Sequence, residues 1–183
     1  MSAEEREVGG EPPAPETRTT AGAAIVLAVR WWALLGGLLT LALAAMTAAS
    51  AVSNAVTGRP FAADYELVKH IIAVAIFMFL PYCQITGSNV TVDIFTEGMS
   101  ERGKAAMAIF SACFALAFSL LLLVQMTGGF GGYLRYQEVT PVLKLPLWTA
   151  FPPILMSLVL LFLAACVTLA ASWRSWRAGS AAG

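Results

Sequence analysis

Four long stretches of the chain contain no charged side chain, and the charged positions gather in the segments between them. The uncharged stretches cover residues 31–58, 71–92, 105–134 and 145–173. A helix needs about 20 residues to cross ~30 Å of hydrocarbon, so each stretch is long enough for one span. The stretches neither alternate in polarity nor stop after about ten positions, as strands of a membrane barrel would. The pattern therefore predicts an all-α integral membrane protein with four transmembrane helices.

The expected spans cover about residues 31–57, 66–87, 104–128 and 148–173, inside a transmembrane domain at 30–177. Short connections between the spans favour an antiparallel bundle. Composition agrees with this assignment, because only 12% of the residues are charged while 58% are hydrophobic. Soluble domains carry about 25% charged residues, so a soluble surface is excluded.

The two ends of the chain differ from the spans. Residues 1–29 combine several prolines with five glutamates, and we expect them to form a disordered cytoplasmic tail. The acidic start and the length of the first apolar stretch distinguish this region from a cleavable signal peptide. Residues 178–183 are expected to form a short C-terminal tail.

The distribution of Lys and Arg near the ends of the spans predicts the orientation of the protein. One side would carry six basic residues, namely Arg18, Arg30, Arg102, Lys104, Arg174 and Arg177. The opposite side would carry four, namely Arg59, Lys69, Arg135 and Lys144. Cytoplasmic loops are enriched in basic residues, so we expect both termini to lie in the cytoplasm.

Glycine and proline predict where the third and fourth spans end and begin. The run GGFGG at 128–132 is expected to end the third span and to open a flexible loop. Proline suits the first turn of a helix, so the regular fourth helix is expected to begin near Pro152, after Pro146. Residues 143–151 would then lie at the membrane interface, anchored by Trp148.

A cluster of charged side chains opens the second span. Glu66 stands three residues before Lys69 and four before His70, so the three side chains can share one helical face. One interpretation is an interfacial cap that fixes the depth of the helix. The other is a polar contact with a partner membrane protein, because ionisable groups at membrane depth usually find partners.

The first span is rich in small residues, including Gly37 and Ala45. Small side chains allow a second helix to approach closely in lipid, so Gly37 and Ala45 are candidates for a contact between subunits. The alternative is that alanine is simply common in this chain.

Motifs for catalysis, metal binding or nucleotide binding are weak. The string GMSERGK at 98–104 fits the start of a phosphate-binding loop, but Ala105 replaces the Ser or Thr that would hold Mg²⁺ and no α/β domain surrounds it. Cys83, Cys113 and Cys166 stand singly on different spans, and His70 is the only histidine. We therefore expect no catalytic residue, no cofactor, no metal site and no nucleic-acid partner.

Several motifs together resemble a known family. They are DYEL at 64–67, NVTVDIF at 89–95, RGK at 102–104, EVTPVLKLPLW at 138–148 and FPPILMS at 151–157. With four spans in a short chain, they resemble the small, Q-type (DctQ-like) membrane subunit of tripartite ATP-independent periplasmic (TRAP) transporters. One departure is Gly87-Ser88-Asn89, where family members often carry a basic residue or histidine before the V-x-V-D that Asp93 closes.

The resemblance implies a scaffold subunit in the bacterial inner membrane that takes part in the uptake of organic acids. Its expected partners are the lipid bilayer, a periplasmic solute-binding protein and a large permease subunit that holds the substrate and Na⁺ sites. The candidate subunit-contact residues are Glu66, Lys69, His70, Gly37, Ala45 and Asp93.

Three alternatives remain beside this hypothesis. One is the small subunit of a tricarboxylate-type tripartite transporter. Another is a self-sufficient four-helix transporter, which would need an intramembrane carboxylate that the first span lacks. The third is a membrane enzyme, for which the sequence offers no convincing set of catalytic residues.

Overall fold

The computed structural model describes residues 20–59, 61, 64–87 and 101–181, and this part of the chain is helical except for loops and one isolated β-bridge. The elements are α1 (Thr20–Thr57), α2 (Asp64–Thr86), α4 (Glu101–Tyr136), the 3₁₀ turn η1 (Leu147–Ala150) and α5 (Phe151–Ala181). Each of the four α-helices provides a stretch that is long and apolar enough to cross a membrane. The expected all-α fold with four membrane-spanning helices is thus confirmed.

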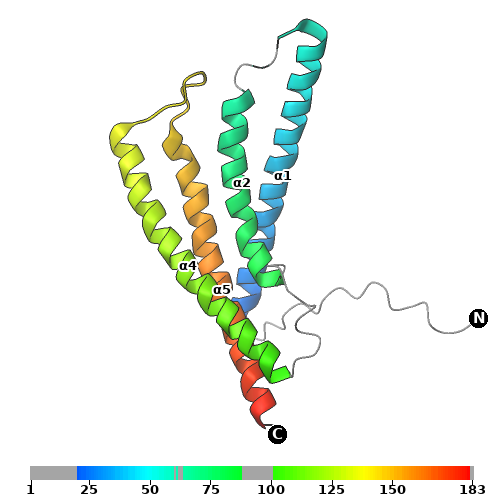
Figure 1. Cartoon of the computed structure of the whole chain (residues 1–183), viewed down its shortest axis with the longest axis vertical. Helices are drawn as coiled ribbons and strands as arrows, with labels where there is room; N and C mark the ends of the chain where they lie inside the picture. Colours follow the sequence, from blue (N-terminus) through cyan, green and yellow to red (C-terminus); the bar gives the residue numbers. More distant parts are fainter. Residues whose placement is uncertain (1–19, 60, 62–63, 88–100, 182–183) are drawn as a thin grey trace, which may run out of the picture.

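The helices form a row in which α2 and α5 lie between α1 and α4 (Figure 1). The main contacts join α1 to α2, α2 to α5, and α5 to α4. The helices come together toward the end where α1 begins and α5 finishes, and they spread apart toward the other end (Figure 1). The inner pair α2 and α5 therefore connects the two outer helices.

The packed core lies mainly between α2 and α5. Its larger cluster joins Val74 and Met78 of α2 to Ile154, Leu158 and Leu161 of α5. Lipid tails are as apolar as these side chains, so close van der Waals packing, and not escape from water, drives their association.

Hydrogen bonds between polar side chains cross the helix interfaces. The indole Nε1 of Trp32 donates to Ser157 Oγ at 2.9 Å, which links α1 to α5. The amide Nε2 of Gln84 donates to Thr168 Oγ1 at 3.3 Å, which links α2 to α5. Polar side chains inside the apolar stretches thus bond to one another between helices.

The first helix begins earlier than the sequence indicated. Residues 20–29 were expected in the disordered tail, but they form the first turns of α1. The reason is packing: Val29 is only 1% exposed and contacts a cluster that includes Ile85, Leu160 and Ala164. The remaining tail, residues 1–19, lies outside the described residues.

The prediction that GGFGG ends the third span is wrong. Helix α4 continues through these glycines to Tyr136, because a backbone in an apolar environment keeps its hydrogen bonds within the helix. Gly129 packs beside the Phe151 ring, where an added Cβ would lie at an ordinary contact distance of 3.5 Å from a ring carbon. The helix ends where Gln137 adopts a positive φ of 46° and its N–H bonds to the Tyr133 carbonyl.

The start of the fourth helix agrees with the proline pattern. Leu147–Ala150 forms a 3₁₀ turn, and the regular helix begins at Phe151, so that Pro152 and Pro153 occupy its first turn. Proline lacks an N–H, and the first turn of a helix does not use that group. At its other end α5 runs on to Ala181, past the expected end of the span at 173 and into the expected C-terminal tail.

Candidate functional site

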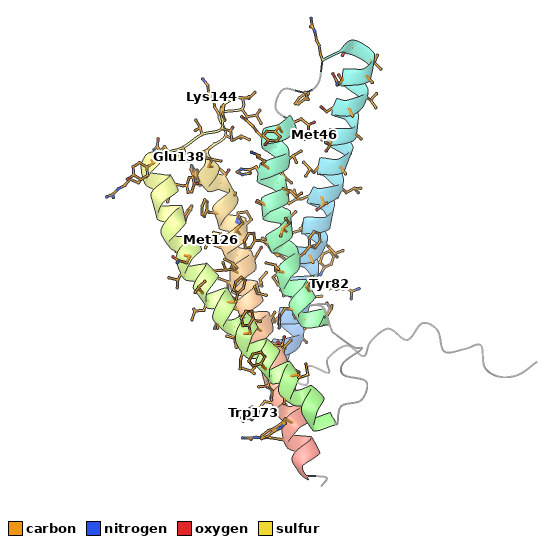
Figure 2. All side chains as sticks on the ribbon, viewed as in Figure 1. Met46, Tyr82, Met126, Glu138, Lys144 and Trp173 are labelled. Atoms are coloured by element: carbon orange, nitrogen blue, oxygen red, sulfur yellow. The ribbon has the colours of Figure 1, made fainter. Side chains whose placement is uncertain are left out.

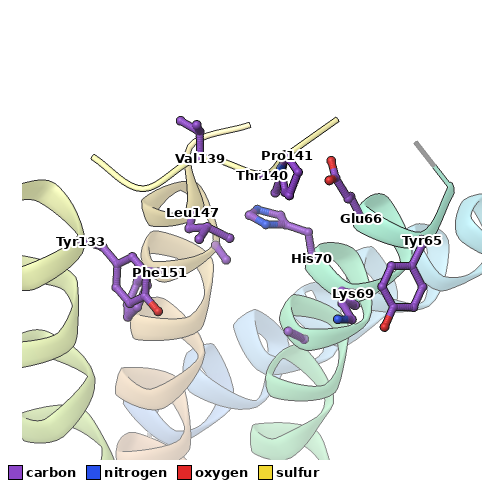
Figure 3. A pocket seen from close by; sticks show the side chains of 12 residues that line it. Tyr65, Glu66, Lys69, His70, Tyr133, Val139, Thr140, Pro141, Leu147 and Phe151 are labelled. Atoms are coloured by element: carbon purple, nitrogen blue, oxygen red, sulfur yellow. The ribbon is translucent and has the colours of Figure 1, made fainter. Parts of the chain in front are cut away.

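The charged cluster at the start of α2 faces the loop that joins α4 to η1 (Figure 3). This loop folds back on itself, since Val139 and Pro146 form an antiparallel bridge and Leu147 N–H bonds to the Glu138 carbonyl at 3.0 Å. Figure 2 shows Glu138 and Lys144 at the end of the molecule where the helices spread apart, far from Trp173 at the other end. The loop between Glu138 and Leu147 is called the α4–η1 hairpin below.

Glu66 holds the tip of this hairpin. Its Oε1 accepts the backbone N–H of Val142 at 2.8 Å, and its Oε2 accepts that of Leu143 at 2.9 Å. Successive N–H groups that point the same way form a small anion-binding concavity, and hydrogen bonds to a carboxylate are stronger than those between neutral groups. The carboxylate therefore ties α2 to a loop 76 residues further along the chain.

His70, one turn after Glu66, contacts the segment that follows the hairpin. Its Nε2 lies 3.0 Å from Thr149 Oγ1. The Thr149 hydroxyl donates its single hydrogen to the Pro146 carbonyl at 2.7 Å, so it acts as the acceptor toward the imidazole. An Nε2–H tautomer of His70 can therefore donate to this hydroxyl.

Lys69 does not join these two side chains. Its Nζ lies 4.3 Å from the centre of the Tyr65 ring on the preceding turn, a cation–π arrangement. The cluster and the hairpin together line a cavity of about 490 Å³ that is open to the outside. Tyr133 of α4 and Phe151 of α5 form its wall on the side opposite the cluster (Figure 3). Apolar side chains supply most of its wall.

The structure places the candidate contact residues in different parts of the molecule. Glu66 and His70 point to the same stretch of the chain, whereas Lys69 pairs with its own helix. Gly37 and Ala45 lie on α1, where Ala45 is exposed and an added Cβ at Gly37 would meet no atom within 4 Å. Asp93 lies outside the described residues.

The contact of Glu66 with its own chain was not part of either sequence interpretation, the cap or the partner contact. The partners of Glu66 (Val142 and Leu143) and of His70 (Thr149) were not identified in the sequence. Two prolines at 141 and 146 do signal a turn there. The pattern holds no sign that the N–H groups of this turn point toward α2, because that depends on how α4 and α5 pack.

The arrangement is suited to holding a loop in place. Within the described residues, no group of three or more His, Cys, Asp or Glu is close enough to hold a metal ion. Cys83, Cys113 and Cys166 are free thiols on three different helices.

Comparison with known proteins gives one match. The family model described as "Tripartite ATP-independent periplasmic transporters, DctQ component" matches residues 43–177. No curated protein and no solved structure matches the chain. The matched range takes in α2, α4, the α4–η1 hairpin, most of α5 and the second part of α1.

Proposed function

We propose, on the premise that this chain belongs to the DctQ-component family of tripartite ATP-independent periplasmic transporters, that it is a scaffold beside a larger permease subunit. In this role the small subunit would hold the permease at a fixed depth and orientation in the membrane. The family assignment favours this system over the tricarboxylate-type alternative.

The observation that carries the scaffold role is the absence of Asp, Glu, Lys, Arg and His from the four apolar stretches. Transporters that couple to ions place ionisable groups or broken helices near the middle of the membrane. Here the polar side chains of Trp32 and Gln84 are hydrogen-bonded to α5 within the chain. The side chains of the spans therefore give no support for a polar pathway along which this subunit could carry an anion or a cation.

The wider system would be a secondary transporter for organic acids in the bacterial inner membrane. A periplasmic solute-binding protein would deliver the solute, and the large permease subunit would hold the substrate and the Na⁺ ions. Glu66 and His70 would contribute indirectly, by fixing the α4–η1 hairpin at the face that meets these partners.

The orientation that we propose is an antiparallel set of spans with both termini in the cytoplasm. The excess of Lys and Arg on the terminal side supports it. Reporter fusions after Ser2 and at Gly183 should then report cytoplasm, and fusions near Gly58 and Tyr136 should report periplasm. The reverse pattern would place the α4–η1 hairpin in the cytoplasm and would contradict the proposed role of that hairpin.

Co-purification tests the scaffold role. The full chain, affinity-tagged and co-expressed with the large permease of the same transporter, should retain the permease through purification in mild detergent. The control is the same tag on an unrelated four-helix membrane protein. Failure to retain the permease, with both proteins present and folded in the membrane, would contradict a permanent scaffold.

A further inference from the structure

A groove of about 600 Å³ runs between the outward faces of α1 and α2, away from the α4–η1 hairpin. Two adjacent glycines produce it. A Cβ at Gly36 would lie 3.0 Å from Met78 Cβ, so Gly36 lets the two helices approach closely. A Cβ at Gly37 would meet nothing within 4 Å, so Gly37 leaves the floor of the groove open.

One end of this groove is polar. Gly36 packs beside Met78 and Phe79, and from there the groove reaches Tyr82 on the next turn of α2 and Arg30 toward the start of α1. Tyr82 lies near the end of α2 (Figure 2). Arg30 forms no ion pair within the described residues. A guanidinium has the planar fork of donors that matches phosphate oxygens.

An exposed tryptophan beside Arg30 supports placing this polar end at the membrane interface. Trp31, beside Arg30, is 63% exposed, and tryptophan is enriched at the level of lipid headgroups. The other lining residues of α1 are apolar and end at Leu41.

The length of the groove fits one leaflet. The eleven steps from Arg30 to Leu41 rise by about 16 Å in a helix. Half of a ~30 Å hydrocarbon core is ~15 Å. A helix from a partner subunit would cross the whole core, yet the groove stops at Leu41 although α1 continues to Thr57.

We propose that this groove binds one phospholipid from the leaflet that Arg30 faces, with the lipid phosphate at Arg30 and Tyr82 and an acyl chain over Gly37. The charge at one end, the apolar floor and the one-leaflet length all match such a molecule. This site is separate from the Glu66 cluster and holds whether or not the scaffold role is correct.

Native mass spectrometry of the full chain tests the site. After stepwise delipidation in mild detergent, one phospholipid per chain should remain bound, and phosphatidylglycerol should rebind to a stripped sample. Inorganic phosphate and glycerol 3-phosphate are tested as competitors at the same concentrations. Displacement of the lipid by either one would show a site for free phosphate only and would overturn the proposal.

Two variants address the two ends of the site. Arg30→Gln should weaken retention by about tenfold, the scale of one lost hydrogen bond to a charged group. Gly37→Leu fills the floor and should abolish retention. The matched controls are Arg59→Gln, just beyond the end of α1, and Gly128→Leu, where an added Cβ also meets open space. Equal losses in the variants and their controls would indicate unspecific lipid association and would contradict the site.

Photolabelling of the wild-type chain tests the groove without relying on the folding of these variants. A phosphatidylglycerol with a photoreactive acyl chain, added to membranes that contain the chain, should label residues 34–41 preferentially. Uniform labelling of the outer surface of α1 would overturn the proposal. A photoreactive residue at Leu38 that cross-links to the large permease instead of lipid would show that a partner helix fills the groove, with the same consequence.

Discussion

The inner helices α2 and α5 differ from the outer helices α1 and α4 in how they use their side chains. Both ends of the Gln84–Thr168 bond and most of the larger core cluster lie on the inner pair. The outer pair leaves large apolar side chains uncovered, among them Leu38 on α1 and Phe110 and Phe114 on α4. The inner pair therefore stabilises the fold, and the outer pair provides apolar surface for lipid or for a partner.

The largest expected effect breaks the inner packing. Ala164 of α5 has no exposed surface, so Ala164→Phe must push α5 away from α1 and α2. Overpacking of this kind costs about 1–3 kcal/mol, and we expect a clear loss of thermal stability in detergent. Ala45→Phe on the exposed face of α1 is the control and should leave the stability of the isolated chain nearly unchanged. Equal destabilisation by the two changes would remove the distinction between inner and outer helices.

The same Ala45→Phe variant tests what the outer surface contacts. If the small-residue face of α1 meets the large permease, a bulky ring there should separate the subunits while the chain itself stays folded. Retention of the permease on the tagged chain measures this. Full retention would exclude the Ala45 face as the contact and direct attention to α4.

A smaller and more local effect is expected at the hairpin. Glu66→Ala frees the N–H groups of Val142 and Leu143, so hydrogen exchange at these two amides should become several-fold faster while exchange in the cores of α2 and α5 stays slow. Glu138→Ala, an exposed acid on the same hairpin, is the control. Unchanged exchange at Val142 and Leu143 would show that Glu66 does not hold the loop.

The smallest effect concerns the link between an outer and an inner helix. Trp32→Phe removes the N–H that donates to Ser157, and such bonds in membrane proteins contribute about 0.6 kcal/mol. Trp31→Phe, on the exposed side of the same turn, is the matched control. A double-mutant cycle with Ser157→Ala isolates the coupling energy. A coupling energy of zero between Trp32 and Ser157 would show that packing alone, and not this hydrogen bond, holds α1 against α5.

The sequence predicted the number of spans because long uncharged stretches have few other structural solutions in lipid. The proline rule also predicted a start of the fourth helix near Pro152, one residue from the observed start of α5 at Phe151. The glycine rule failed at 128–132, because the cost of glycine in a helix is small beside that of unpaired backbone groups in an apolar environment.

The candidate site was only partly predictable. The spacing within DYELVKH predicted that Glu66 and His70 share one helical face at the edge of a span. Their partners Val142, Leu143 and Thr149 are more than 70 residues away and act through backbone groups or a single hydroxyl, which leave no pattern in the sequence. Likewise, GG at 36–37 reads as one feature, yet packing assigns Gly36 to the contact with α2 and Gly37 to an open groove.

Uptake into liposomes tests the central claim most directly, namely that this chain is a scaffold and not a transporter. The chain is reconstituted alone, and in parallel with the large permease, with the periplasmic binding protein and a Na⁺ gradient present in both cases. Organic-acid uptake should occur only when the permease is present, because the four apolar stretches of this chain contain no Asp, Glu, Lys, Arg or His. Gradient-dependent uptake by this chain alone would contradict the account.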